Sequence, residues 1–144
     1  MGKIRLNSEE IKYITLFETL TGAIVKDCVS VQDMMAFLIK KGDMGLAIGK
    51  NGSNIEKVRD AIGKSVVVME FSDNTENFIK NLFHPTRIKK VRINGGDNDK
   101  IVDIEVNKPD RKKVIGHNGV RIKIAKKLAK RHYNINNINV NISR

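Results

Sequence analysis

Apolar residues in the first half of the chain switch between helical and strand spacing. Helical spacing of about three comes first, at Ile11, Ile14, Phe17 and Leu20. Asn7 or Ser8 can cap this helix, and Gly22 can end it. The pattern then predicts a strand, a strand, a short helix, a helix and a strand, at 24–31, 34–39, Met44–Ile48, 54–62 and 66–71.

The second half of the chain repeats this order of elements. A helix is expected near 75–83, ended by Pro85, and a strand at 88–93. The turn Asn94-Gly95-Gly96-Asp97-Asn98 leads into a second strand at 101–106, a hairpin pattern. The remaining expected elements are a short helix, a long helix and a strand of apolar residues alternating with asparagines, at Arg111–Ile115, 120–132 and 138–142.

The repetition extends to individual residues. Ile48-Gly49-Lys50-Asn51-Gly52 reappears 67 positions later as Ile115-Gly116-His117-Asn118-Gly119. The match continues on both sides without a gap, so that Asp43 falls on Asp110. Each aspartate stands just before a predicted short helix, where it can cap free amides. The two halves are therefore two copies of one supersecondary unit.

The sequence predicts an α+β fold with two tandem domains, 1–73 and 74–144, each of α-β-β-α-α-β order. In each domain, helices should cover one face of a three-stranded sheet. The segment 74–86 carries an apolar helical stripe that includes Phe78 and Leu82. We therefore expect it to be a linking helix packed on the second domain.

Each Gly-x-x-Gly pair lies between two predicted helices, where glycine has a physical role. Glycine permits positive φ and close backbone approach, and the next helix presents free amides and the positive end of its dipole. A phosphate chain suits such a loop, as in KH domains, which clamp about four nucleotides of single-stranded RNA. The bases would lie in an adjacent groove floored by aliphatic side chains. The predicted RNA-binding residues are Ile48, Gly49, Lys50, Asn51, Gly52, Ile115, Gly116, His117, Asn118, Gly119 and Arg121.

These loops carry a resemblance to a known family. The stretch 45–58, with Ile48-Gly49-Lys50-Asn51-Gly52, resembles the first KH motif of NusA transcription factors, and 114–122 resembles the second. The chain is similar to the short archaeal NusA proteins, which consist of the KH pair alone. This resemblance implies binding of nascent RNA and a part in transcription termination or antitermination. RNA polymerase is only a candidate partner, because the polymerase-binding domain that bacterial NusA adds does not fit in 144 residues.

The second loop differs from the first in its charge. His117 replaces Lys50, and a neutral imidazole adds no charge near pH 7. Arg121 lies two residues past the loop, and we expect it to reach over the loop toward the groove, because guanidinium groups suit phosphates. The alternative is that Arg121 extends to solvent. The other cations of this helix should lie on a solvated face, and they are Lys123, Lys126, Lys127 and Lys130.

Positive charge is concentrated in the second half of the chain. The 144 residues include 27 Lys and Arg against 16 Asp and Glu, for a formal charge of +11. Residues 1–72 carry 10 basic and 9 acidic side chains, whereas 73–144 carry 17 and 7. A basic surface fits a polyanionic partner, although the same excess also serves solubility.

Other kinds of chemistry lack their motifs. Gly45-x-x-x-Gly49-Lys50-Asn51 has one residue too few between its glycines for a nucleotide-binding loop, and Asn where Ser or Thr must meet magnesium. Asp97-Asn98-Asp99 begins like a calcium loop, but Ile101 occupies a required oxygen position. The histidines lack metal-ligand spacing, and no nucleophile is paired with a base. We expect no enzyme activity, no metal and no cofactor.

The cysteine count, the N-terminus and the apolar runs indicate the cellular compartment. Cys28 is the only cysteine, so no internal disulfide can form and a reducing cytosol is expected. The N-terminus lacks the apolar run of a signal peptide. The longest wholly apolar run, Met34–Ile39, is too short to span a membrane. We expect a cytoplasmic monomer without membrane association.

Two other functions are compatible with the same loops. A ribosomal or RNA-processing KH protein would share both domains, although long basic tails, which would favour it, are absent from this sequence. A protein-interaction module could use degenerate glycine loops to dock on a partner such as RNA polymerase. Filter binding to single-stranded RNA separates this last alternative from the RNA-binding hypothesis.

Overall fold

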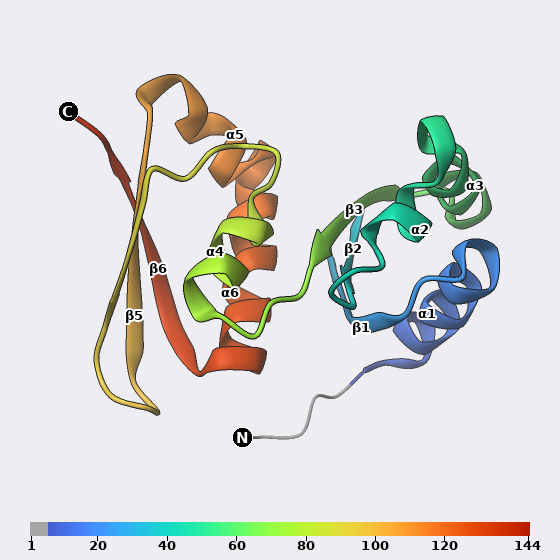
Figure 1. Ribbon diagram of the computed structural model, residues 1–144, viewed down its shortest axis with the longest axis horizontal. Coiled ribbons are helices and arrows are strands. Elements are labelled where there is room, and N and C mark those ends of the chain that lie inside the picture. Colours follow the sequence, from blue (N-terminus) through green and yellow to red (C-terminus); the bar gives the residue numbers. More distant parts are fainter. Residues whose placement is uncertain (1–5) are drawn as a thin grey trace. The chain divides into compact units, whose positions relative to one another are not determined.

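The computed structural model describes residues 6–144, and the chain passes from one compact unit to the next between Phe71 and Ser72. The boundary expected from the sequence lies two residues later. Each unit has the element order α-β-β-α-α-β, with its helices on one face of a three-stranded sheet (Figure 1). The predicted fold class is confirmed.

The elements lie close to their predicted positions. In the first unit they are α1 (Ser8–Thr21), β1 (Val25–Val31), β2 (Met34–Ile39), α2 (Met44–Ile48), α3 (Ser53–Ile62) and β3 (Ser65–Glu70). In the second unit they are α4 (Thr75–Leu82), β4 (Lys90–Asn94), β5 (Lys100–Val106), α5 (Arg111–Ile115), α6 (Val120–Tyr133) and β6 (Ile135–Ile142). Single 3-10 turns precede α3, α5 and α6, at Lys50–Gly52, Lys108–Asp110 and His117–Gly119.

Both sheets have the same topology, with the second strand in the centre. β1 and β2 pair antiparallel, and β2 and β3 pair parallel. β4, β5 and β6 repeat this arrangement. A parallel pair needs a long crossover connection, and in each unit this crossover consists of two helices joined by the glycine loop. The sheet topology therefore places each loop between the helices that follow the central strand.

The start and end of α1 follow the sequence prediction. The Asn7 side chain accepts a hydrogen bond from the Glu10 amide at 2.7 Å, and the Asn7 amide donates to the Glu10 carboxylate at 3.1 Å. Gly22 ends the helix with a φ of 77°. The second Glu10 oxygen accepts from the Ser30 amide at 3.2 Å. This buried carboxylate therefore also connects α1 to β1.

The two aspartates expected to cap the short helices do not cap them. Neither Asp43 nor Asp110 makes a side-chain hydrogen bond to the first turn of its helix. The Asp43 carboxylate accepts instead from the Ile24 amide at 2.9 Å, and Asp110 lies 3.8 Å from the ammonium of Lys113. The prediction was wrong for Asp43 because an amide 19 residues away takes its carboxylate.

The core of the first unit is built around two aromatic rings. The centroids of Phe17 on α1 and Phe37 on β2 are 4.5 Å apart, and both side chains are fully buried. The rest of this core is aliphatic, apart from Met35 and the buried Cys28. Helix and sheet are therefore held together mainly by apolar burial.

In the second unit, α4 packs on α6. The Phe78 ring lies 4.9 Å from that of Tyr133 and 6.0 Å from that of His132. The Tyr133 hydroxyl donates to the carbonyl of Ser72, and burial is the main cause that raises the pKa of Tyr133. These contacts fix α4, because its apolar face, which includes Leu82, is buried.

Replacing Phe17 with alanine should lower the stability of the first unit by about 3–5 kcal/mol, because the cavity would lie in its core. The matched control is Ile11→Ala on the same helix, where the side chain is 54% exposed, and it should cost less than about 1 kcal/mol. Native-state hydrogen exchange of the β1 and β2 amides in the full chain measures both. Equal losses would contradict the assigned core.

Candidate nucleic-acid interface

The two glycine loops have the same backbone conformation. Gly49 has φ 76° and ψ 172°, and Gly116 has φ 82° and ψ 168°. Asn51 and Asn118 share a φ of 56°, in the left-handed region. The loops close through amide-to-carbonyl bonds between their two glycines, of 3.1 Å in both units. The repeat in the sequence is therefore a repeat in three dimensions.

The first glycine of each loop is required by a close approach. A Cβ on Gly49 would lie 2.8 Å from the backbone nitrogen of Asn54, and one on Gly116 would lie 2.7 Å from the Cβ of Arg121. Backbone with positive φ and extended ψ is also almost exclusive to glycine. The loop thus folds back against the first turn of the helix that follows it.

The middle residues of both loops are exposed. Lys50, Asn51, His117 and Asn118 all project to solvent. Within residues 6–144, no hydrogen bond or ion pair engages the side chain of any of them. Each loop leads directly into a longer helix, α3 or α6, whose N-terminus attracts negative charge. The predicted loop residues are brought together, and an anion can reach them.

Arg121 is held by the chain itself. Its Nε donates to the Leu82 carbonyl at 3.2 Å, and its Nη2 donates to Leu82 and His84 at 2.9 and 3.1 Å. Burial lowers the pKa of this guanidinium. The Arg121 Cβ lies close to Gly116. Contrary to the prediction from the sequence, the Arg121 guanidinium does not reach the groove, because the carbonyls at the end of α4 take its donors. Asn54 holds the equivalent position in the first unit, and its side chain donates to the Leu46 carbonyl at 2.7 Å.

Sequence reasoning missed Lys123 as a loop residue. It is exposed, as expected, but a Cβ on Gly119 would lie 3.8 Å from the Lys123 Cε. The Lys123 ammonium lies 3.5 Å from the carbonyl of Asn118. The first unit has Glu56 at this position, paired with Arg59 at 2.7 Å. Lys123 lies in the first turn of the helix that follows the loop, and this position in the sequence could have identified it.

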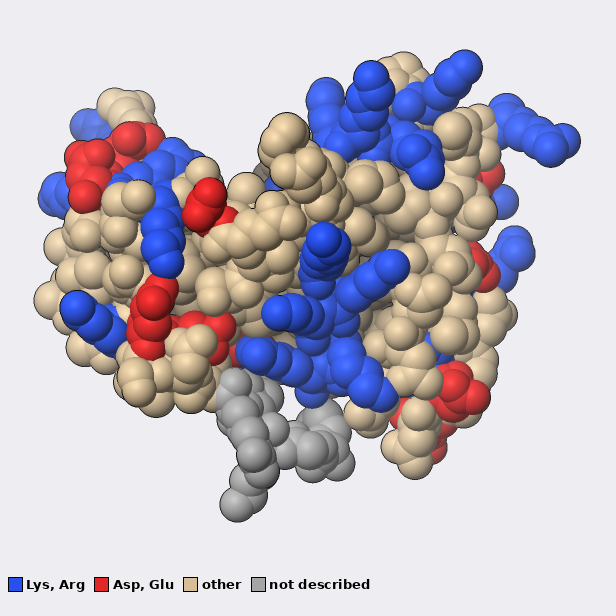
Figure 2. Space-filling view, turned by 180° about the vertical axis from the view of Figure 1, so that it is seen from behind, with Lys and Arg blue, Asp and Glu red and all other residues tan. Residues whose placement is uncertain are grey.

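A cavity of about 470 Å³ lies beside the second loop, between the helices and the edge strand β6. Its apolar lining comes from α5, α6 and β6, and the residues are Ile115, Ile122, Ile138 and Val140. Arg111 and Lys126 add positive charge on the helix side. Figure 2 shows basic side chains gathered over α5 and α6, whereas acidic and basic side chains are mixed on the first unit.

The sequence of each unit matches a known domain family. Residues 10–73 match the KH domain, and residues 75–141 match the NusA-like second KH domain. A relative in Methanocaldococcus jannaschii, "Probable transcription termination protein NusA", is 37% identical over 97% of this chain and 76% of its own length. The chain belongs to the NusA family.

Two further comparisons agree with membership of the NusA family. The protein of the same name in Halobacterium salinarum is 35% identical over 94% of this chain and 96% of its own length. The crystal structure of APE1850 superposes with a TM-score of 0.77 at 29% identity, covering 94% of this chain and 99% of that one. These relatives are named as probable transcription termination proteins, and KH domains are RNA-binding modules.

Metal-binding clusters and membrane-spanning helices are absent from residues 6–144 of this NusA-family chain. Within residues 6–144, no three His, Cys, Asp or Glu residues lie close enough together to hold a metal ion. None of the helices in that range has the length and apolar character needed to cross a membrane.

Replacing Gly49 with alanine should destabilise the first unit by about 2–4 kcal/mol, because strain in this backbone region adds to the clash with Asn54. Gly52→Ala is the matched control, since its nearest neighbour would be 3.9 Å away, and it should cost only about 1–2 kcal/mol. Denaturant unfolding of the full chain, monitored by hydrogen exchange of the α3 amides, measures both losses of stability. A larger loss at Gly52 would show that the close approach is not the constraint.

Proposed function

We propose that this protein binds single-stranded nascent RNA through both Gly-x-x-Gly loops and acts in transcription termination or antitermination. The observation that carries the proposal is the shared loop geometry, with exposed middle residues and a helix N-terminus behind each loop. The loop residues with their preceding isoleucines are those predicted from the sequence: Ile48, Gly49, Lys50, Asn51, Gly52, Ile115, Gly116, His117, Asn118 and Gly119.

The phosphate chain is the part of RNA that suits the loops. An RNA backbone laid on a loop meets glycines without side chains, so its phosphates can approach the peptide backbone. The dipoles of α3 and α6 favour the negative charge. Lys50 supplies a cation in the first loop, and Lys123 supplies one in the second, where His117 stands in place of Lys50.

The proposed role of Arg121 in RNA binding is smaller than the role that the sequence suggested. Nε and Nη2 are occupied by the carbonyls of Leu82 and His84. Nη1 makes no hydrogen bond within the described residues, and only this nitrogen is left to donate to a phosphate. Arg121 thus contributes to RNA binding chiefly by fixing the end of α4 beside the loop.

Replacing Lys50 and Asn51 together with aspartate should abolish RNA binding by the first unit, and His117→Asp with Asn118→Asp should do so in the second. The added carboxylates would stand where a phosphate must approach. Each pair should leave its unit folded, because all four side chains are exposed. Filter binding of the full chain to a short single-stranded RNA measures the loss, which should exceed tenfold for each pair, since repulsion replaces a contact of about 1.4 kcal/mol or more.

Matched controls carry the same change of charge elsewhere. Lys12→Asp with Thr15→Asp alters the exposed side of α1, and Gly96→Asp with Asn98→Asp alters the β4–β5 turn. That turn lies at the start of β5, whereas the second loop follows its end, so about 20 Å of strand separates them. RNA affinity that is unchanged in both loop variants would overturn the clamp and favour docking on a protein such as RNA polymerase.

RNA binding through the second loop should depend more steeply on salt than binding through the first. The cations on the helix side of its groove, Arg111 and Lys126, are unpaired within the described residues, and each added phosphate contact contributes about −0.7 to the slope of log affinity against log salt. In the full chain, the aspartate pair in one loop leaves RNA binding to the other loop. Each of these two variants therefore measures the salt dependence of a single loop. Equal slopes would show that the basic surface faces away from the RNA.

A further inference from the structure

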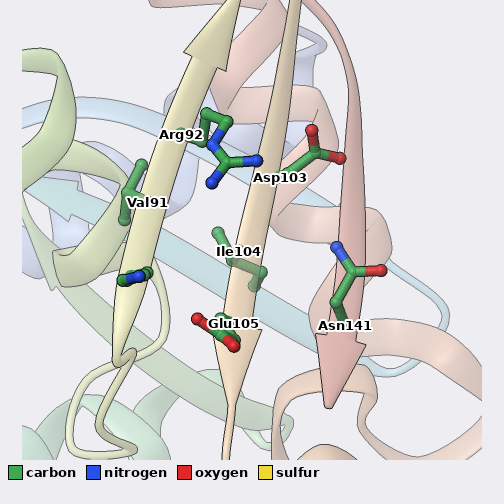
Figure 3. Close-up of a pocket in the computed structure, with 7 residues that line it drawn as sticks. Val91, Arg92, Asp103, Ile104, Glu105 and Asn141 are labelled. Atoms are coloured by element: carbon green, nitrogen blue, oxygen red, sulfur yellow. The ribbon is translucent and has the colours of Figure 1, made fainter. Parts of the chain in front are cut away.

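The open face of the second sheet, on the side away from the helices, carries balanced charges. Across β4 and β5, Lys90 lies opposite Glu105 and Arg92 lies opposite Asp103. Figure 3 shows Arg92, Asp103 and Glu105 on this face, around a cavity of about 520 Å³. Each cation therefore stands across from a carboxylate. These pairs add no net charge, so the positive excess of the second unit lies on its other surfaces.

The charges of α6 are all of one sign. The helix contains no Asp or Glu, and its cations are Arg121, Lys123, Lys126, Lys127, Lys130 and Arg131. The equivalent helix of the first unit, α3, mixes both signs, because Glu56 and Asp60 stand where α6 has Lys123 and Lys127. Both helices follow loops of the same conformation. The loop conformation therefore does not require the lysines of α6.

Three of these lysines form one exposed row, the lysine stripe, which consists of Lys123, Lys127 and Lys130. With about 3.6 residues per turn, the three positions fall within an arc of about 60° around the helix axis. All three side chains are exposed. A rise of about 1.5 Å per residue gives the stripe a length of about 10 Å along α6. The stripe begins in the first turn after the glycine loop and continues away from it.

Contacts at both ends connect the lysine stripe to neighbouring segments. The Lys123 ammonium lies 3.5 Å from the carbonyl of Asn118, in the loop. The Lys130 ammonium donates to the Asn136 side chain at 2.6 Å, and the Asn136 amide donates to Asp99 at 2.8 Å. Among the described residues, the middle lysine has no hydrogen-bond partner, and no carboxylate forms an ion pair with any of the three. The stripe therefore keeps its charge.

We propose that the lysine stripe binds phosphates of the RNA strand that extends beyond the second loop. A strand held in the loop passes beside Lys123, and the other two lysines continue its path along α6. Lysine contacts a phosphate as a point charge, and such a contact is independent of base sequence. This inference rests on the proposed RNA-binding function.

The lysine stripe would give the two units sites of different length. With one phosphate at each lysine, the second unit would hold roughly two or three nucleotides more than the clamp of about four. On the same path in the first unit, Glu56 and Asp60 would repel a phosphate. The clamp of the first unit therefore ends at its loop, whereas that of the second continues along the helix.

The test uses the full chain with the first loop inactivated by Lys50→Asp and Asn51→Asp, so that RNA binding reports on the second unit. The probes are oligouridines of about four and about ten nucleotides, and the short one fills the clamp alone. Lys127→Gln with Lys130→Gln should make the slope of log affinity against log salt shallower by about 1.4 for the long probe, since each phosphate contact contributes about 0.7. Over an about fourfold rise in salt, the loss of affinity should then be about sevenfold smaller. The slope for the short probe should not change.

The matched control, Lys90→Gln with Arg92→Gln, removes the same charge from the open sheet face. Both of these side chains are exposed, and their loss should leave both slopes unchanged. Lys127→Arg with Lys130→Arg keeps the charge of the stripe and should keep the steep slope of the long probe. Lys127→Gln alone leaves the contact between Lys130 and Asn136 in place, and it should give a change of about 0.7. Thermal unfolding verifies that each variant is folded.

The possible failures can be told apart. A slope for the long probe that is the same with and without the two lysines overturns the lysine stripe as an RNA site, leaves it to solvent or to a protein partner, and leaves the clamp intact. An equal change with the short probe, or in the sheet-face control, assigns the effect to overall charge and also overturns the stripe. No binding of either probe in this background overturns the proposed function of the second loop, and this inference with it.

Discussion

The close approach of one glycine to the helix that follows it is the constraint on which each loop depends. At Gly49 and Gly116 the backbone turns with positive φ and extended ψ, and no side chain fits between the loop and the next helix. This turn reverses the chain between the two crossover helices, which lets the third strand of each sheet pair in parallel with the central one. It also aims a helix N-terminus at the same point as the exposed loop residues, so one backbone requirement serves both the fold and the site.

The two loops have the same backbone conformation, but different side chains surround them. Five residues after the first glycine, Asn54 binds the carbonyl of the short helix before its loop, while Arg121 reaches the end of α4. Four residues after the second glycine, Glu56 and Lys123 have opposite charges. The loop dihedrals nevertheless agree closely. Backbone geometry is therefore conserved between the units, whereas the charge around each loop is adjustable.

Most of the fold could be predicted because its determinants are local. The spacing of Ile11 and Phe17, the glycine stops and the internal repeat each act over a few residues, and together they predicted the element order and both loops. Two of the failures have a common cause, since a contact from a distant segment decided them. The carboxylate of Asp43 is taken by Ile24, and the guanidinium of Arg121 by α4. No local rule identifies such partners.

The uneven distribution of charge has a kinetic consequence. Electrostatic attraction raises the rate at which a polyanion meets a basic surface, and it acts before any contact forms. Residues 1–72 have a balance of +1 and residues 73–144 a balance of +10. Under the proposed function, the second unit would therefore capture an RNA first. The nearly neutral first unit would then sample RNA that is already tethered, at a high effective concentration. The difference in charge between the two units would thus set the order in which they bind a growing transcript.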